Sequence, residues 1–214
     1  MRDGLLQARQ VVERALAAGG RACLTCSFQA EDVAVLHIVK AFQPDLAVFF
    51  LDTGYHFAAV LAYRTRIAEL FGIEVVNLRH QAPTLHPDTP AECCHQRKVE
   101  PLMAGLNGYD LWFTGLRRQQ SPTRANLQPE ETHRFPNGLA LRKVSPLFDW
   151  TTAEVHAYLA ANDIPELPLY AQGYTSIGCE PCTSKPQPGD HERAGRWGGR
   201  KLECGLHTVT VKES

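Results

Sequence analysis

The 214-residue sequence lacks a long apolar segment, an excess of charge of either sign and an internal repeat. Its longest apolar runs, such as residues 46–51, are far shorter than the roughly 20 residues that cross a bilayer. Residues 1–10 lack the apolar segment of a signal peptide. Because 22 Lys and Arg face 23 Asp and Glu, no overall field favours nucleic acid or an acidic membrane. We expect a soluble cytoplasmic protein that binds neither nucleic acid nor a membrane. Any site for an anionic ligand would have to be formed by a local group of residues.

We expect no structural disulfides in this location, since they are rare in a reducing compartment, and an odd count of 7 cysteines would leave one unpaired. Cys23 and Cys26 fall within one predicted strand, where a spacing of three turns their side chains to opposite faces. We interpret both as packing residues. The other five cysteines are left for metal binding or redox chemistry.

Strand and helix patterns alternate through the first two-thirds of the chain, and the hydrophobic content of 44% is typical of a globular protein. Strands are predicted at residues 22–28, 46–51, 73–78, 110–114 and 139–144. Helices are predicted at residues 5–16, 29–43, 55–72, 92–106 and 151–161, with a break or kink at Pro101 and a cap at Thr151 or Thr152. This alternation predicts an α/β fold with a doubly wound, mainly parallel sheet.

Proline and glycine become frequent after residue 165, where regular structure should be sparse. We therefore divide the chain into an α/β domain at residues 1–164 and a segment at residues 165–214 that wraps over it. No linker defines a second core.

Ligands of an open α/β sheet bind beyond the carboxyl ends of its strands, where residues 27–32 and 52–55 are expected. Ser27 and the following backbone N–H groups either cap a helix or cradle an anion. Asp52 and Thr53 either make a turn or bind a ribose or an adenine edge. The residues alone leave both alternatives open.

Two cysteine pairs are the sharpest chemical signal: Cys93 with Cys94, and Cys179 with Cys182. Zinc accepts four sulfurs, but adjacent cysteines on a helix point about 100° apart, which suits one tetrahedral ion poorly. A 4Fe–4S cluster is larger and takes one thiolate at each iron corner. The donor set favours the cluster over zinc, and inert packing does not explain two pairs.

Basic residues lie near these segments in three pairs: Arg97 with Lys98, Arg117 with Arg118, and Arg193 with Arg196. The first pair follows Cys93 and Cys94 by one helical turn, where a cation could balance an anionic cluster and reach an anionic substrate. Paired guanidinium groups bind sulfate and phosphate bidentately, so the other pairs predict a ligand with several negative charges. Ordinary surface salt bridges are the alternative.

Cys204 lies in a glycine-containing terminal stretch, poorly placed for the core and well placed to move. Arg193, Arg196 and His207 could lower its pKa and favour the thiolate. Because Cys204 is expected beside a metal site and an anion site, we interpret it as a nucleophile.

Together these segments resemble the assimilatory phosphoadenylyl- and adenylyl-sulfate reductase family, in its iron–sulfur branch. The matching stretches occur in family order: SFQAED (27–32), LDTGY (51–55), CCHQRKVEPL (93–102), GLRRQQSPTRA (115–125), SPLFDW (145–150), GYTSIGCEPCT (173–183), RAGRW (193–197) and ECGLH (203–207). The resemblance implies an adenine-nucleotide α-hydrolase-like fold with a mobile C-terminal catalytic tail. The first 164 residues would bind the nucleotide, and residues 165–214 would complete a cluster.

The resemblance also implies a function: reduction of adenosine 5′-phosphosulfate (APS) to sulfite and AMP, with thioredoxin or a glutaredoxin-like donor as reductant. Cys204 would attack the sulfur of APS and form S-sulfocysteine, assisted by Lys98 and His207. A 4Fe–4S cluster would be held by Cys93, Cys94, Cys179 and Cys182. Substrate would be bound by Ser27, Asp52, Thr53, Arg117, Arg118, Arg193 and Arg196. A homo-oligomer is compatible with this family.

Two other functions are alternatives to this one. An RNA-thiolation or nucleotidyl-transfer enzyme of the same fold is expected to carry an SGGxDS-type loop, and residues 27–32 do not match it. A cluster-based redox sensor predicts no nucleotide-binding edge, against which Ser27, Asp52 and Arg117 argue.

Overall fold

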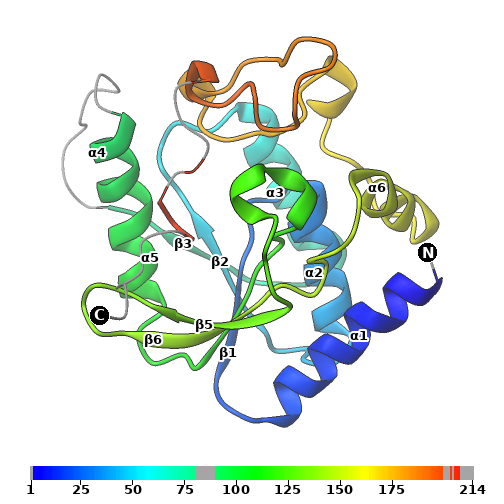
Figure 1. The fold of residues 1–214 in the computed structure, drawn as a ribbon, viewed down its shortest axis with the longest axis vertical. Coiled ribbons are helices and arrows are strands. Elements are labelled where there is room, and N and C mark those ends of the chain that lie inside the picture. The colour runs from blue at the N-terminus through cyan, green and yellow to red at the C-terminus, as the bar shows by residue number, and fades with distance from the viewer. Residues whose placement is uncertain (1, 81–89, 200–202, 204, 208–214) are drawn as a thin grey trace.

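The computed structural model describes residues 2–80, 90–199, 203 and 205–207. Its centre is one six-stranded sheet in the order β3-β2-β1-β4-β6-β5, in which only the β5–β6 pair is antiparallel (Figure 1). The strands are β1 (Ala22–Thr25), β2 (Ala47–Leu51), β3 (Val75–Leu78), β4 (Leu111–Phe113), β5 (Glu130–Arg134) and β6 (Ala140–Val144). The predicted α/β class and mainly parallel, doubly wound sheet are confirmed.

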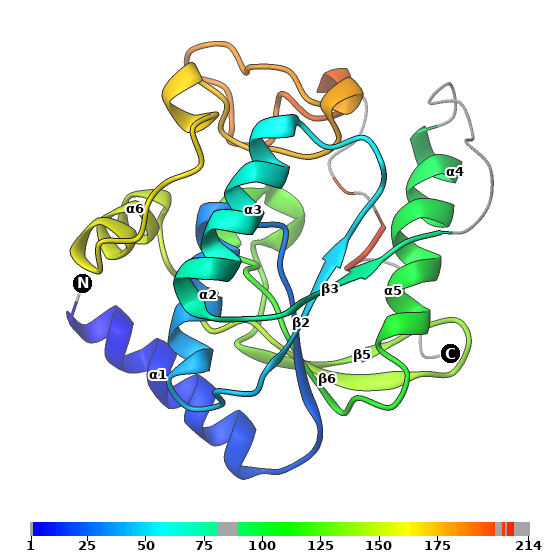
Figure 2. The same ribbon diagram turned by 180° about the vertical axis from the view of Figure 1, so that it is seen from behind.

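Both faces of the sheet are covered, because successive side chains of its buried central strands point to opposite sides. The helices are α1 (Arg2–Ala17), α2 (Ala30–Lys40), α3 (Ala58–Phe71), α4 (Pro90–Cys94), α5 (Glu100–Gly105) and α6 (Thr152–Ala161). Leu24 and Phe113 pack with α1, α2, α3 and α6, whereas Cys23 and Trp112 pack with α5 on the other side (Figures 1 and 2). Among the described residues, none of these helices is both long and apolar enough to span a membrane.

Strand β5 is an element that the sequence did not predict. Its residues EETHR are mostly polar, and only His133 is buried. The strand pairs along its whole length with β6 at the edge of the sheet. An edge strand is exposed on one side, so it carries little of the apolar pattern by which buried strands are found.

The helical run that contains the first cysteine pair continues through Pro101, so of the predicted break or kink there, the break does not occur. A π-helical turn, η1 (His95–Val99), joins α4 to α5, and the Glu100 N–H donates to the His95 carbonyl. Pro101 then sits in the first turn of α5, where its missing N–H has no cost. The widened turn accommodates the proline without a break.

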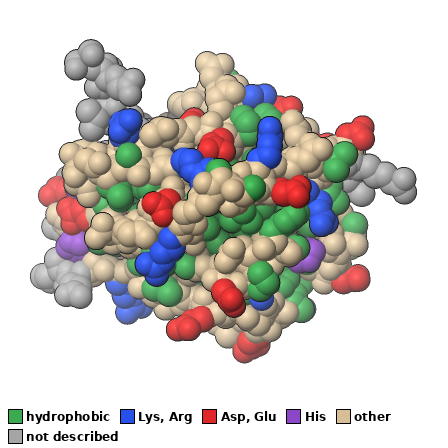
Figure 3. Space-filling view, turned by 90° about the horizontal axis from the view of Figure 1, so that it is seen from below, with side chains coloured by type: hydrophobic (Ala, Val, Ile, Leu, Met, Phe, Trp, Pro, Cys, Tyr) green, Lys and Arg blue, Asp and Glu red, His purple; other side chains and the backbone are tan. Residues whose placement is uncertain are grey.

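Helix α6 begins as predicted, with Thr151 as its N-cap in a reciprocal capping box with Glu154. After α6 the chain crosses the carboxyl ends of the strands (Figures 1 and 2). Backbone contacts attach this crossing segment, residues 165–199, to the body: the Glu180 N–H donates to the Tyr55 carbonyl at 2.7 Å. The opposite end of the molecule carries interspersed acidic and basic side chains (Figure 3), as the near-zero net charge leads one to expect.

Candidate active site

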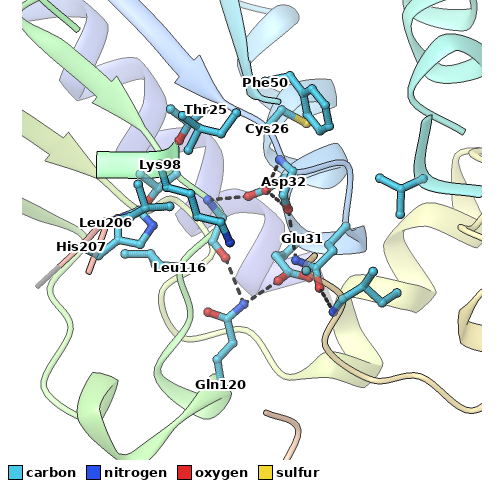
Figure 4. A pocket seen from close by; sticks show the side chains of 18 of the residues that line it. Thr25, Cys26, Glu31, Asp32, Phe50, Lys98, Leu116, Gln120, Leu206 and His207 are labelled. Carbon is cyan, nitrogen blue, oxygen red and sulfur yellow. Dashed lines mark hydrogen bonds between the residues drawn. The ribbon is translucent and has the colours of Figure 1, made fainter. Parts of the chain in front are cut away.

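A cleft of about 970 Å³, counting the part open to solvent, lies at the carboxyl ends of β1, β2 and β4, under the crossing segment (Figure 4). Strand β1 pairs with β2 on one side and β4 on the other, so the sheet order reverses here. Doubly wound folds bind ligands at such a reversal. Its polar lining comes from five regions: Ser27, Glu31 and Asp32 after β1; His56 after β2; Gln120 and Arg124 after β4; Lys98 in η1; and Arg193, Arg196 and His207 near the C-terminus.

The loop between β1 and α2 forms one wall of the cleft. Ser27 donates from both its backbone N–H (2.7 Å) and its hydroxyl (2.6 Å) to the Asp32 carboxylate. The Gly115 N–H donates to the same carboxylate at 3.1 Å. A Cβ on Gly115 would lie 2.2 Å from Asp32 Oδ1, so only glycine permits this approach. The Ser27 donors thus bind a protein acceptor in this arrangement.

Glu31 brings a carboxyl group to the same wall. Burial raises its pKa to about 7, although the Arg117 charge acts in the opposite direction. The Gln120 side-chain amide donates to Glu31 at 2.6 Å. Glu31 therefore changes charge near neutral pH beside the cleft.

Cations also line the cleft, among them Lys98, Arg193 and Arg196, which the sequence predicts to meet an anionic substrate. The Arg196 guanidinium carbon lies 4.5 Å from the Trp197 ring centre. Its terminal nitrogen would be 2.0 Å from a Cβ on Gly178, so a side chain at that glycine would displace it. Four cations in one cleft, Arg124 included, can bind a ligand with several negative charges.

A second, smaller cavity is lined by Cys93, Cys94, Cys179 and Cys182, the four cysteines of the two predicted pairs. The first pair ends α4; in the second, Cys179 precedes the short turn η5 (Glu180–Cys182) and Cys182 ends it. Burial, followed by the charges of Cys94 and Cys179, raises the pKa of the Cys93 thiol. The four cysteines of the two pairs therefore border one cavity between the α4–η1 helical run and the crossing segment.

Lys98 and Cys179 line both the cysteine cavity and the cleft. Burial acts to raise the pKa of Cys179, but the Lys98 charge and a hydrogen bond with Thr53 outweigh it, and the pKa is lowered. The neighbouring Arg97 instead donates to the Thr53 carbonyl at 2.9 Å. Lys98 is thus the cation of this pair that connects the two cavities.

The described part of the tail also reaches the cleft. The His207 ring stacks on Trp112, with centroids 5.1 Å apart and planes at 18°. Burial, reinforced by the Lys143 and Arg124 charges, holds the pKa of His207 well below its ordinary range. His207 is therefore neutral here and is not the additional cation that the sequence predicted. Cys204 lies outside the described residues.

Three predicted substrate-binding side chains make other contacts and do not line the cleft. Arg117 is fully buried and bonds Glu192 at 3.1 Å and the Trp150 carbonyl at 3.2 Å. The Arg118 guanidinium lies over the Phe148 ring and bonds Asp149, and Asp52 pairs with Arg79 at 2.6 Å. Thr53, the remaining one, lines the cysteine cavity.

Sequence reasoning did not single out Glu31, Gln120, Arg124 or Glu203. Arg124 follows Arg117 by seven residues in the same motif and lines the cleft, whereas adjacent Arg117 and Arg118 drew attention as a pair. The motif GLRRQQSPTRA, which contains Gln120 and Arg124, was the sequence feature from which these two residues could have been identified. The turns η2 (Arg118–Gln120) and η3 (Pro122–Arg124), which decide where each arginine points, did not follow from it.

Comparison with known proteins identifies relatives over most of the chain. A phosphoadenosine phosphosulfate reductase domain matches residues 21–185. A protein of Chelativorans sp. (strain BNC1), named adenosine 5′-phosphosulfate reductase, is 40% identical over 221 residues, covering 96% of this chain and 88% of its own.

Two solved structures share the fold. A phosphoadenylyl-sulfate (PAPS) reductase from Candida auris, in a phosphate complex, superposes with a TM-score of 0.70 at 22% identity, covering 83% of this chain and 90% of that one. An FMN adenylyltransferase of Candida glabrata gives a TM-score of 0.66 at 15% identity, covering 87% and 65% respectively. The fold is adenine-nucleotide α-hydrolase-like. The chain belongs to the phosphoadenosine phosphosulfate reductase family.

Proposed function

We propose that this protein is a cytoplasmic, thioredoxin-dependent reductase that converts APS to sulfite and AMP. The name shared by its 40% identical relatives, adenosine 5′-phosphosulfate reductase, supports this substrate. The observation that carries the proposal is the pair of adjoining cavities: a cation-lined cleft at the sheet reversal and a four-cysteine cavity, joined by Lys98 and Cys179.

A 4Fe–4S cluster would be held by Cys93, Cys94, Cys179 and Cys182, and the lining of one cavity by all four supports this assignment. Among the described residues, no three His, Cys, Asp or Glu side chains converge on a point as a single metal ion requires. A cluster takes each thiolate at a separate iron and does not need that convergence. When bound, it would supply an anionic group beside Lys98, with an electrostatic and structural role.

The cation-lined cleft suits the phosphosulfate of APS. Lys98, Arg193 and Arg196 can neutralise its charge, most usefully as negative charge develops on the leaving phosphate. Phe49 and Phe50 line the apolar part of the cleft, where a nucleoside would fit. Ser27 belongs to the wall beside it.

The chemistry then needs one nucleophile and one reductant. The Cys204 thiolate attacks the APS sulfur, the bond from sulfur to the bridging oxygen breaks, and AMP leaves with that electron pair. A thioredoxin thiolate next attacks the Cys204 sulfur, which breaks the sulfur–sulfur bond and releases sulfite. The second thioredoxin thiol resolves the mixed disulfide and returns Cys204 as a thiol.

The test is sulfite release with thioredoxin and either APS or its 3′-phosphorylated form, alongside iron and sulfide analysis. We expect turnover of APS and about four irons per chain, with loss of iron in Cys94→Ser. Stoichiometric zinc would contradict the cluster, and turnover of only the 3′-phosphorylated compound would contradict the substrate.

A further inference from the structure

Glu203 is a glutamate near the C-terminus whose carboxylate is enclosed by a ring of donors. Arg124 donates to it at 2.9 Å from Nε and 2.7 Å from a terminal nitrogen, and the Thr123 hydroxyl lies at 2.9 Å. The Ser121 hydroxyl donates at 3.1 Å, and Arg193 approaches to 3.7 Å. Only 11% of the Glu203 side chain is exposed. These contacts are more numerous and better shielded from solvent than those of a surface salt bridge.

The receptacle for Glu203 belongs to the cleft itself. Ser121, Thr123 and Arg124 form the turn η3 and the residue before it, and Arg124 and Arg193 line the cleft. Arg124 also bonds Gln120, whose amide in turn donates to Glu31 across the cleft wall. The carboxylate of Glu203 is therefore joined through side chains to the loop that follows β1.

A second attachment lies three residues further along the tail. Leu206 packs in the apolar cluster beneath α5, and His207 stacks on Trp112. The described residues on both sides of position 204 are thus fixed to the body, one by charge and the other by apolar contact. In the proposed reaction, position 204 carries the nucleophile.

We propose that Glu203 is a positioning residue: its carboxylate, received by Ser121, Thr123 and Arg124, fastens the tail to the cleft so that Cys204 is presented to the bound substrate. The presentation of Cys204 to substrate rests on the proposed function, whereas the attachment of Glu203 to the cleft does not. Glu203 touches no reacting atom in this role. Its loss therefore lowers the rate of sulfur transfer without lowering nucleotide affinity.

The first test measures the rate at which Cys204 becomes S-sulfonated in a single turnover with APS, together with AMP affinity. Glu203→Gln keeps the size of the side chain and removes its charge. We expect the rate to fall about tenfold or more, since small displacements of a reacting group have effects of that order. AMP affinity stays within about twofold or rises, because Arg124 and Arg193 lose a competing anion. Glu69→Gln, an exposed change far along α3, is the matched control and leaves both unchanged.

A conservative variant and a structural readout separate positioning from a general loss of folding. Glu203→Asp keeps the charge and recovers part of the rate. Hydrogen exchange of the peptide that contains Gly205 and His207 quickens in Glu203→Gln. When Glu203→Gln is combined with Ser121→Ala, the loss of sulfonation rate is smaller than the two single losses together predict.

An unchanged sulfonation rate in Glu203→Gln, an AMP affinity that falls in parallel with the rate, or unchanged exchange would overturn the proposal. If the wild-type protein itself forms no adduct, the proposed function fails. The exchange experiment then still decides whether Glu203 fastens the tail.

Discussion

At the scale of single residues, burial distinguishes two adjacent arginines, Arg117 and Arg118, neither of which lines the cleft. Arg117 lies in the interior, bound to Glu192, to the Thr152 hydroxyl and to a backbone carbonyl. Arg118 is one-third exposed, and the carboxylate with which it pairs, Asp149, is itself exposed. Removing a buried partner leaves a carboxylate without its counter-charge, whereas loss of a surface pair has little effect.

Thermal unfolding should separate the two arginines. Arg117→Ala is expected to lose about 3 kcal/mol of folding free energy, equivalent to a fall in Tm of about 6–12 °C. Arg118→Ala should lose less than about 1 kcal/mol. Equal and small losses in both variants, or lost APS binding without lost stability in Arg117→Ala, would return Arg117 to the substrate-binding role predicted from sequence.

Glu31 gives a prediction about pH. Burial raises its folded-state pKa to about 7 from an ordinary value of 4.5. Between these values the folded protein keeps a proton that the unfolded chain releases, so stability falls as pH rises through this interval. Glu31→Gln cannot titrate and still accepts from Gln120 through its side-chain oxygen. The free energy of unfolding of Glu31→Gln, relative to that of the wild type, should therefore rise by about 3 kcal/mol between pH 5 and pH 8. A pH-independent difference in Tm would show that Glu31 keeps an ordinary pKa.

At the scale of elements, the cleft depends on how closely the end of β4 approaches the start of α2. Gly115→Ala places a Cβ 2.2 Å from Asp32 Oδ1 and 2.9 Å from the Asp32 backbone nitrogen. We expect the loop to move, AMP affinity to fall about tenfold and stability to fall by about 2–3 kcal/mol. Gly138→Ala, in the β5–β6 hairpin, meets no atom within 4 Å but has a φ of +85°. It should cost about 1 kcal/mol and leave AMP affinity unchanged, so equal effects in calorimetric titration would contradict this account.

The elements also mark how far the sequence could predict the fold. The run at residues 46–51 is apolar because β2 is buried on both faces, and Thr151 caps α6 by a local rule, so both were predictable. Strand β5 was not predictable from apolar alternation, because its residues are mostly polar and it lies at the edge of the sheet beside β6. Nor were the direction of Arg117 and the contacts of Glu203 predictable, since both partners lie in segments that meet only after folding.

At the scale of the whole molecule, the two cysteine pairs belong to parts that approach each other only in the folded chain. One pair ends α4, and the other lies in the crossing segment that covers the cleft. A group that binds both pairs would stabilise the folded state by its binding free energy.

Removal of the proposed cluster by an iron chelator under oxidising conditions should therefore loosen the crossing segment. Hydrogen exchange is expected to quicken in residues 173–199 and to change little in α1 and α2, while the Tm falls. Exchange in the crossing segment that is the same with and without iron would show that the cysteine cavity does not link the two parts.

The central claim is that Cys204 carries the sulfur-transfer chemistry beside a cation-lined cleft. Mass spectrometry of the protein mixed with APS, without any reductant, tests it most directly. Cys23 and Cys26 serve as internal controls, because burial raises the pKa of both thiols. The account predicts one added sulfonate per chain, on the peptide that contains Cys204, and none in Cys204→Ser. A sulfonate on any other cysteine, or full sulfite release by Cys204→Ser, would contradict it.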